Sequence, residues 1–565
     1  MTLPGLTHVL LEGPFLPLAA LIWPLVLGLL AALPRLRAHV MMALPLAPIP
    51  ALILALSGAV SGQTRAPDLL LGVALGLDAE GALLLGAIGA LWLLAGIHAL
   101  GYMKRPDRPA VFVGFWCLTL AGNLGVVLAQ DVVTFYVAFA AVSLAAYFLV
   151  VHEGTDEALA AGKVYIVLAV IGEALLLAGL MVGASSADSL LIADVRAVLG
   201  ADGWNGLALT AIVLAMGIKA GLVPLHIWLP LAHPAAPTPA SAVLSGAIVK
   251  AGIIGLLRFV PGDAEVMGWT LVVLGLFGAY GGVIVGLGQK RIKAVLAYST
   301  VSQMGVVIAL CGAGVVTGQT ALAYSAAALY CAHHALAKGA LFLAVGVAHG
   351  SSARLIPFVV IATGVVAASV AGAPLAGGAI AKSVIKPAFE GIPLLLVTLS
   401  AIGTTALLAR FIVMLGRSHS AMSNAEPGLA MAGAWLAASV GALVLPWLVG
   451  GAFMANEASY YLAPGALWSS LWPVGVGLAG FALVLKFVRL RIWFAEGDIA
   501  PWVVAGARRG AHVIAHRRRL APPSLPGVSS APLRRLVSRI EAGLALPVMA
   551  GLAMMAMIAA IVLFR

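Results

Sequence analysis

The stretch MGIKAGLVPLHIWLP, residues 216–230, places a lysine, a proline and a histidine inside an otherwise apolar segment. A lysine at the centre of a membrane helix costs roughly 2.5–3.5 kcal/mol on insertion scales. Proline interrupts a helix because it lacks a backbone N–H group. The stretch therefore predicts a broken membrane helix, with Lys219 buried beside a break at Pro224.

The composition of the whole chain indicates a membrane protein. Of its 565 residues, 62% are hydrophobic and 9% are charged, and the mean hydropathy is +1.09. Such a chain has too little polar surface to cover a soluble globule. We expect an all-α polytopic membrane protein with about 16 transmembrane helices. The expected spans are 15–34, 39–62, 80–103, 111–130, 131–151, 162–184, 207–228, 239–260, 267–289, 293–316, 318–347, 356–386, 392–415, 429–452, 467–488 and 543–564.

The basic residues indicate how these spans are oriented. Loops after odd-numbered spans hold 23 of the 32 lysines and arginines, against four in the loops on the other side. Because cytoplasmic loops are enriched in basic residues, both termini are predicted to be periplasmic in a bacterial-type inner membrane. The first residues lack a basic n-region, so we expect no cleaved signal peptide. The net charge of +11 then describes an inner face attracted to anionic lipid or a cytoplasmic partner, and nucleic acid is not needed to explain it.

The three cysteines do not indicate a metal or redox centre. Cys117, Cys311 and Cys331 are widely separated and all lie in apolar spans. None has the spacing of a metal or cluster ligand, and buried cysteine packs as a small hydrophobe. We therefore expect no metal, no cofactor and no redox or hydrolytic centre in this chain. Whether it is the membrane subunit of an enzyme complex stays open.

A second span is also interrupted. Span 356–386 contains Pro374, Gly377 and Gly378 before Lys382. Its place relative to the first broken span would give the two helices opposite orientations, as in an inverted repeat. The predicted division is 1–110 (helices 1–3), 111–260 and 261–416 (the two five-helix repeats), 417–488 (helices 14 and 15), 489–541 (a basic segment) and 542–565 (the last helix). The basic segment is read either as an amphipathic interfacial helix or as a cytoplasmic linker.

A few ionisable groups remain inside the expected spans, and they are candidates for a proton path. Burial disfavours the charged form of a lysine, so a buried lysine can take up and release a proton near physiological pH, and histidine already titrates there. Groups of this kind joined by water form a proton relay. The candidates are Lys219, Lys250, Lys338, Lys382, Glu173, His226, His333 and His334.

Structural explanations for the same residues stay open. Lys250 could extend its ammonium toward the membrane surface, and Lys382 could cap the end of a half-helix. For His226 and for the pair His333 and His334, a hydrogen bond between helices is the alternative.

Four stretches carry a resemblance to a known family. The first motif is highly specific, and the match runs through most of 80–415. The stretches are GIKAGLVPLHIWLPLAHPAAPTPASAVLSGAIVKAG (217–252), KRIKAVLAYSTVSQMG (290–305), HHALAKGALFLAVG (333–346) and PLAGGAIAKSVIK (374–386). In these stretches the sequence resembles the antiporter-like membrane subunits shared by respiratory complex I, Mrp-type cation/proton antiporters and energy-converting hydrogenases.

The resemblance implies a 14-helix core of two inverted five-helix repeats, with proton half-channels meeting on a central polar axis. Lys219 matches the lysine of the first broken helix, and Lys250 the connecting lysine of the next span. His334 and Lys338 match the histidine and lysine of the eleventh span. Lys382 matches the terminal lysine of the second broken helix. The breaks at Pro224 and Pro374 would be hinges, and His226 a neighbour of Lys219. The implied partners are other membrane subunits of the same complex, with a cytoplasmic redox module as a further option.

One family residue is missing. The family usually has a Trp-Glu pair in the fifth span, seven residues before a tyrosine, and its glutamate pairs with the lysine of the first broken helix. Here Phe139 and Ala140 stand seven residues before Tyr147. We hypothesise that Glu173, in the sixth span, replaces this acid. The alternatives are a glutamate that only joins two helices by a hydrogen bond, and one that faces an unrelated cavity.

The sequence favours a proton-translocating, antiporter-like subunit of a larger complex. A non-conducting structural or coupling subunit is the alternative, supported by the missing glutamate and opposed by the four retained lysines. A stand-alone carrier for a small solute is a third reading, for which the sequence offers no substrate pocket.

Overall fold

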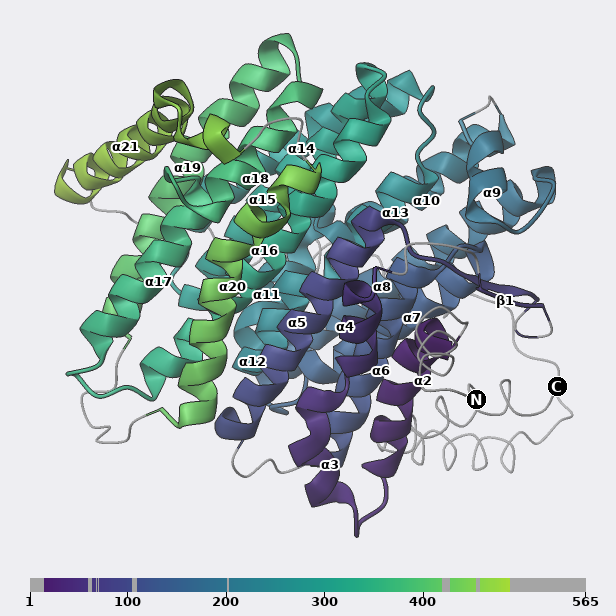
Figure 1. Ribbon diagram of the computed structural model, residues 1–565, viewed down its shortest axis with the longest axis horizontal. Coiled ribbons are helices and arrows are strands. Elements are labelled where there is room, and N and C mark those ends of the chain that lie inside the picture. Colours follow the sequence, from purple (N-terminus) through teal and green to yellow (C-terminus); the bar gives the residue numbers. More distant parts are fainter. Residues whose placement is uncertain are drawn as a thin grey trace, which may run out of the picture.

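The computed structural model describes residues 15–58, 64–67, 69, 71–103, 109–200, 203–418, 427–453 and 458–487. It is a bundle of long helices that run roughly side by side (Figure 1). Within the described residues, 13 helices are long and apolar enough to cross a membrane. The predicted all-α polytopic fold is confirmed, whereas the predicted number of spans is not established. The span 543–564 and the basic segment 489–541 lie outside the described residues.

The first third of the described chain includes a short hairpin that the sequence did not predict. Strands β1 and β2 pair antiparallel, with Arg65 opposite Ala74. The elements are α2 (Phe15–Leu30), α3 (Arg37–Ala43), η1 (Leu44–Leu46), α4 (Ile49–Leu56), β1 (Thr64–Ala66), β2 (Val73–Leu75), α5 (Ala79–Tyr102), α6 (Pro109–Leu128), α7 (Val132–Val150), α8 (Asp156–Ser186) and α9 (Ile192–Val198).

The remaining described elements contain both interrupted helices. They are α10 (Trp204–Ala220), η2 (Leu225–Ile227), α11 (Trp228–Ala235), α12 (Thr238–Val243), the π-helical turn η3 (Leu244–Ile248), α13 (Lys250–Phe259), α14 (Glu265–Leu287), α15 (Ile292–Val316), α16 (Thr320–His349), α17 (Ile356–Ala371), α18 (Gly377–Ile385), η4 (Lys386–Ala388), α19 (Gly391–Gly416), α20 (Leu429–Phe453), η5 (Ala458–Leu462) and α21 (Pro464–Phe487).

The sixth expected span begins earlier than its hydropathy predicts. Helix α8 starts at Asp156, because the Thr155 hydroxyl accepts a hydrogen bond from Ala158 N at 3.1 Å and caps it. Lys163 therefore lies on the second turn of α8, where it is exposed.

Both breaks are built in the same way. Helix α10 ends at Gly221 and α17 ends at Gly372, each in the left-handed conformation, with φ of 81° and 95°. In each case the next amide reaches back five residues: Leu222 N donates to Gly217 O at 2.8 Å, and Ala373 N donates to Ala368 O at 2.9 Å. This hydrogen-bond pattern satisfies the last carbonyls of a helix that stops inside the protein. The predicted breaks near Pro224 and Pro374 coincide with these ends.

The centre of the bundle holds the helices that carry the polar residues. A continuous stretch of 18 residues in each of α15 and α16 is entirely buried inside the protein. Small residues allow α14 and α15 to approach closely: a Cβ added at Gly305 would lie 2.5 Å from Gly275 O. Buried polar residues therefore sit where neighbouring helices can reach them.

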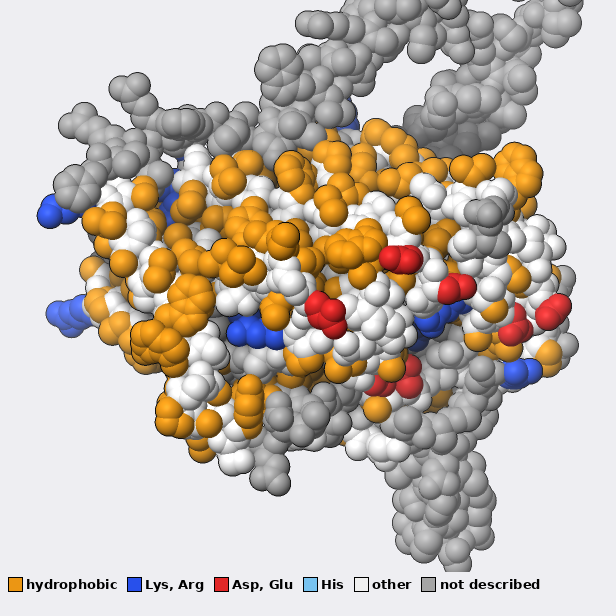
Figure 2. Space-filling model, turned by 90° about the horizontal axis from the view of Figure 1, so that it is seen from above, with side chains coloured by type: hydrophobic (Ala, Val, Ile, Leu, Met, Phe, Trp, Pro, Cys, Tyr) orange, Lys and Arg blue, Asp and Glu red, His pale blue; other side chains and the backbone are white. Residues whose placement is uncertain are grey.

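The end of the bundle where α10, α14 and α16 begin carries acidic side chains. Asp78, Asp188, Asp263 and Glu265 are exposed on the loops and helix starts there. Seen from above, this face shows acidic side chains scattered among hydrophobic ones (Figure 2). It is the face that the distribution of basic residues predicts to be outside.

Candidate functional site

Lys219 lies in the last turn of α10, just before the first break, and is 5% exposed. Its Nζ donates a hydrogen bond to Ser143 Oγ on α7 at 2.5 Å and lies 5.1 Å from the ring centroid of Phe139. Ser143 Oγ donates in turn to Phe139 O at 2.9 Å. The ammonium is therefore held by one hydroxyl and one aromatic face, both from the fifth expected span.

The buried acid approaches this lysine from a different helix. Glu173 on α8 is 7% exposed, interacts electrostatically with Lys219 and lies close to Ser143. Among the described residues, neither of its carboxylate oxygens has a direct hydrogen-bond partner. Ala140, where the resemblance expects an acid, lies one helical turn before Ser143 on α7. An acid is thus present at Lys219, but it comes from α8.

A small cavity adjoins Lys219. It is lined by Phe139, Ser143, Tyr165, Trp228 and neighbouring apolar residues, and its volume of about 10 Å³ is near the minimum for one water molecule. Trp228, after the break, donates to Ile218 O, before it, at 2.7 Å.

His226 points away from the cavity beside Lys219. It is 2% exposed and lies edge-on to Tyr298 of α15, with ring centroids 6.0 Å apart. It is not among the residues that line the Lys219 cavity. The structure therefore places His226 toward the centre of the bundle.

Lys250 and His334 are in direct contact at the bundle centre. Lys250 Nζ lies 2.7 Å from His334 Nδ1 and donates to Ser245 O, also at 2.7 Å. Ser245 belongs to the π-helical turn η3, whose wider geometry alters the backbone bonding just before Lys250. Lys250 is fully buried. The extension toward the membrane surface, considered from the sequence, is therefore not what the structure shows.

Lys338 lies close to the same cluster and donates to a backbone carbonyl. It lies one turn after His334 on α16, and its Nζ donates to Leu296 O at 2.8 Å. Thr300 Oγ1 donates to the same carbonyl at 3.1 Å and lies 2.7 Å from Ser245 Oγ. A pair of hydroxyls thus lies between the two buried lysines, each of which itself donates to a backbone carbonyl.

His333 and Lys382 meet at the second break. His333 Nε2 lies 3.0 Å from Ser369 Oγ, which also accepts from Gly378 N at 3.0 Å. Lys382 Nζ donates to Ala371 O, the last residue of α17, at 3.0 Å, and interacts electrostatically with His333. The capping contact considered for Lys382 is therefore present, in a position that also faces the histidine.

Sequence reasoning missed four residues of this network. His233 is fully buried, stacks on Phe342 with centroids 4.6 Å apart, and interacts electrostatically with Lys250 and Lys338. Lys293, the first residue of the expected span 293–316, donates to Ala236 O at 2.7 Å. The other two are Ser143 and Lys386. His233, Lys293 and Lys386 lie in the quoted motif stretches, which was the available signal.

The acid nearest the fifth span is structural. Asp131 caps α7 by accepting from Thr134 N, and also accepts from Ala74 N, both at 2.8 Å. Among the residues that the structure describes, no group of three His, Cys, Asp or Glu side chains could hold a metal ion. Cys117, Cys311 and Cys331 are buried and unpaired with one another.

Comparisons with known proteins agree on one family. Residues 129–407 match the family described as NADH:quinone oxidoreductase/Mrp antiporter, transmembrane. Hydrogenase-4 component B of Escherichia coli is 30% identical over 284 residues, which are 48% of this chain and 42% of that protein. Na(+)/H(+) antiporter subunit A1 of Staphylococcus haemolyticus is 31% identical over 286 residues, 48% of this chain and 35% of that protein. This chain therefore spans less than half the length of either relative.

A solved structure extends the likeness in fold. A chain of the Mrp complex from Dietzia sp. DQ12-45-1b superimposes with a TM-score of 0.72 at 23% identity, covering 97% of this chain and 68% of that one. At this identity the likeness concerns the fold.

Proposed function

Since residues 129–407 of this chain belong to the NADH:quinone oxidoreductase/Mrp antiporter transmembrane family, we propose that it is a proton-translocating membrane subunit of a complex I-related, Mrp-type or energy-converting hydrogenase-type complex. Its proton path consists of Lys219, Glu173, Lys250, His334, Lys338, His333 and Lys382, with His226 beside it. The breaks near Pro224 and Pro374 are its hinges.

The contact between Lys250 and His334 is the observation that carries this proposal. Two basic groups 2.7 Å apart cannot both point a proton at each other, so one must donate and the other accept. Lys250 also donates to Ser245 O, which favours Lys250 as the donor and His334 Nδ1 as the acceptor. Transfer of that proton breaks an N–H bond on the lysine and forms one on the imidazole. Little rearrangement is needed, because the two atoms already touch.

The surrounding contacts supply the rest of a relay. The Ser245 and Thr300 hydroxyls lie 2.7 Å apart between Lys250 and Lys338, and hydroxyl groups both donate and accept protons. Each lysine itself donates to a backbone carbonyl, which only accepts, so transfer between the lysines and these hydroxyls requires water. His333 then faces Lys382 across the second break. Between the Lys219 cavity and this centre, transfer requires water at the first break, where freed backbone groups can hold it.

Glu173 takes the role of the missing fifth-span acid in this proposal. A carboxylate near Lys219 stabilises its ammonium, and the ammonium becomes easier to discharge when that carboxylate is neutralised or moves. The burial of Glu173 beside both Lys219 and Ser143 supports this role.

We further propose that the chain works with other membrane subunits, in a bacterial-type inner membrane with both termini on the outer side. The relatives support this setting, since the solved likeness is part of an Mrp complex and one relative is named as a component of hydrogenase-4. A cytoplasmic redox module is a partner only if the complex is complex I-related or of the hydrogenase type. Anionic lipid is the expected neighbour of the basic inner face.

A non-conducting coupling subunit is the second candidate, and Ala140 is the observation that favours it. Proton flux in inverted vesicles that contain the native complex separates the two candidates. Lys250→Ala is compared with Lys163→Ala, which removes an exposed lysine of α8, and assembly is checked on mild-detergent gels. We expect Lys250→Ala to assemble and lose flux while Lys163→Ala keeps it. Full flux in an assembled Lys250→Ala complex would favour the coupling subunit.

A further inference from the structure

A large cavity lies at the outer end of the second broken helix. Its volume is about 520 Å³, and it is lined by the first turns of α16 and α21, the end of α18 and the short helices η4 and η5. These ends all belong to the face predicted to be outside. Two lining residues, Leu375 and Tyr460, are 57% and 49% exposed, so the cavity opens at the protein surface.

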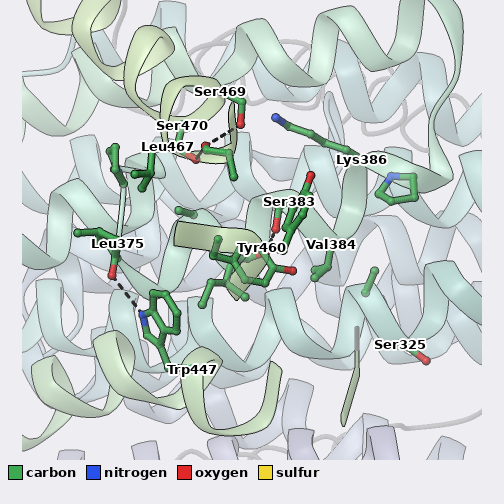
Figure 3. Close-up of a pocket in the computed structure, with 18 of the residues that line it drawn as sticks. Ser325, Leu375, Ser383, Val384, Lys386, Trp447, Tyr460, Leu467, Ser469 and Ser470 are labelled. Carbon is green, nitrogen blue, oxygen red and sulfur yellow. Dashed lines mark hydrogen bonds between the residues drawn. The ribbon is translucent and has the colours of Figure 1, made fainter. Parts of the chain in front are cut away.

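Lys386 is the basic group of this cavity. It is the first residue of η4, directly after α18, and Figure 3 shows its side chain extended in the direction of Ser469. In the described part of the chain, no ion pair or hydrogen bond engages its ammonium, although the residue is only partly exposed. A half-buried amine without a protein partner needs water or an anion to satisfy its donors.

A second, smaller cavity leads from this lysine inward. Its volume is about 40 Å³, enough for a few water molecules. Ser383, Lys386, Ser469 and Ser470 line both cavities. The smaller cavity is also lined by Lys382, so both lysines line the same cavity.

The two lysines also follow one another on the same helix face. Lys382 and Lys386 are four residues apart, at the spacing that stacks side chains along a helix, and they interact electrostatically. Two ammonium groups that are neighbours in this way repel each other, and the repulsion is stronger in a partly desolvated site than in water. A proton that reaches Lys382 therefore favours the release of a proton from Lys386.

We propose that Lys386 is the proton-exchange group of the second half-channel, passing protons between Lys382 and the large cavity. In one direction, an N–H bond of the Lys382 ammonium breaks and, through water, one forms on the neutral Lys386 amine. Lys386 then gives a proton to water in the large cavity, and both lysines are ready for the next proton. This proposal rests on the proton path proposed above and adds its opening to one side of the membrane.

The test is chemical rescue of flux in the native complex. A small soluble base that enters the large cavity can replace a missing exchange group, whereas it cannot repair a structural defect. Proton flux is measured with and without imidazole for Lys386→Ala, Lys386→Gln, Lys386→His and the control Lys290→Ala, an exposed lysine elsewhere. Assembly is checked on the same preparations.

We expect the proton flux of Lys386→Ala and of Lys386→Gln to be lower than that of the wild type by a factor of about ten or more. A positioned proton-transfer group has an effect of at least this size. Imidazole should restore most of it, and Lys386→His should retain flux. Lys290→Ala should be unaffected. Lys250→Ala should lose flux without rescue, because Lys250 is fully buried and lines neither cavity.

Three results would overturn the proposal. Full flux in Lys386→Ala, together with no flux in Lys250→Ala, would support the proton path but would show that Lys386 is not part of it. Lost flux that neither imidazole nor Lys386→His restores would assign Lys386 a structural role, such as an anchor for a lipid headgroup. Full flux in Lys250→Ala would remove the path and this exchange site together.

Discussion

Lys219 at the end of α10 donates a 2.5 Å hydrogen bond to Ser143 in the middle of α7, 76 residues earlier in the chain. The same hydroxyl lies close to Glu173 on α8. Three helices therefore meet at one ammonium group, and a serine stands between the lysine and the acid.

Ser143→Ala should reduce proton flux without abolishing it. A hydrogen bond to a charged group contributes roughly 1.5–3 kcal/mol, which corresponds to a loss of about 10- to 100-fold if it holds the conducting geometry. Ser143→Thr keeps the hydroxyl and should retain most of the flux. Flux in inverted vesicles measures both, and equal flux in the alanine variant and the wild type would exclude a role for the hydroxyl.

Glu173→Gln should abolish most of the flux, because Lys219 then has no nearby carboxylate. Glu265→Gln, which changes an exposed acid at the start of α14, is the matched control. Ala140→Glu restores an acid at the position where the family carries one, on the turn of α7 next to Ser143.

The double variant Glu173→Gln, Ala140→Glu is the sharper comparison. If the acid has moved between helices, this variant should regain flux that Glu173→Gln alone lacks. No recovery in an assembled double variant, or normal flux in Glu173→Gln, would contradict the idea that Glu173 replaces the fifth-span acid.

Gly378→Ala should destabilise the second broken helix. A Cβ at this position would lie 1.7 Å from Ser369 O and 3.0 Å from His333 Cε1, so the start of α18 would have to move. Such overpacking typically costs about 1–3 kcal/mol. Gly364→Ala on α17 places its Cβ in open space and is the control. We expect a lower thermal unfolding temperature of the purified complex for Gly378→Ala alone, and equal temperatures for the two variants would contradict the close packing.

Hydropathy predicted the spans and the two breaks because both follow from local chemistry. Apolar runs set the helices, and proline with glycine set the interruptions. The start of α8 was missed because it depends on the Thr155 cap, and the hairpin of β1 and β2 was missed because it is only three residues long in each strand. Neither leaves a hydropathy signal.

The candidate site was predictable where a residue type was itself unusual. Lysines inside apolar helices are costly, so Lys219, Lys250, Lys338 and Lys382 could be selected from the sequence. Serine and threonine are common in membrane helices, and nothing local distinguishes Ser143 from its neighbours.

Some positions depend on tertiary packing alone. Lys293 stands at the start of an expected span, and nothing local indicates its partner, because Ala236 O is 57 residues away in sequence. His226 points toward Tyr298 because of the turn η2, whose direction the sequence does not specify.

The most direct measurement of the central claim is proton flux in inverted vesicles that contain the native complex with Lys219→Ala, with assembly verified on mild-detergent gels. Lys219 is the single buried amine at the first break within the described residues, so its loss should interrupt the path between the Lys219 cavity and the bundle centre. We expect an assembled complex with flux reduced to background. Wild-type flux in an assembled Lys219→Ala complex would contradict the proposed path, because it would show that protons do not need Lys219.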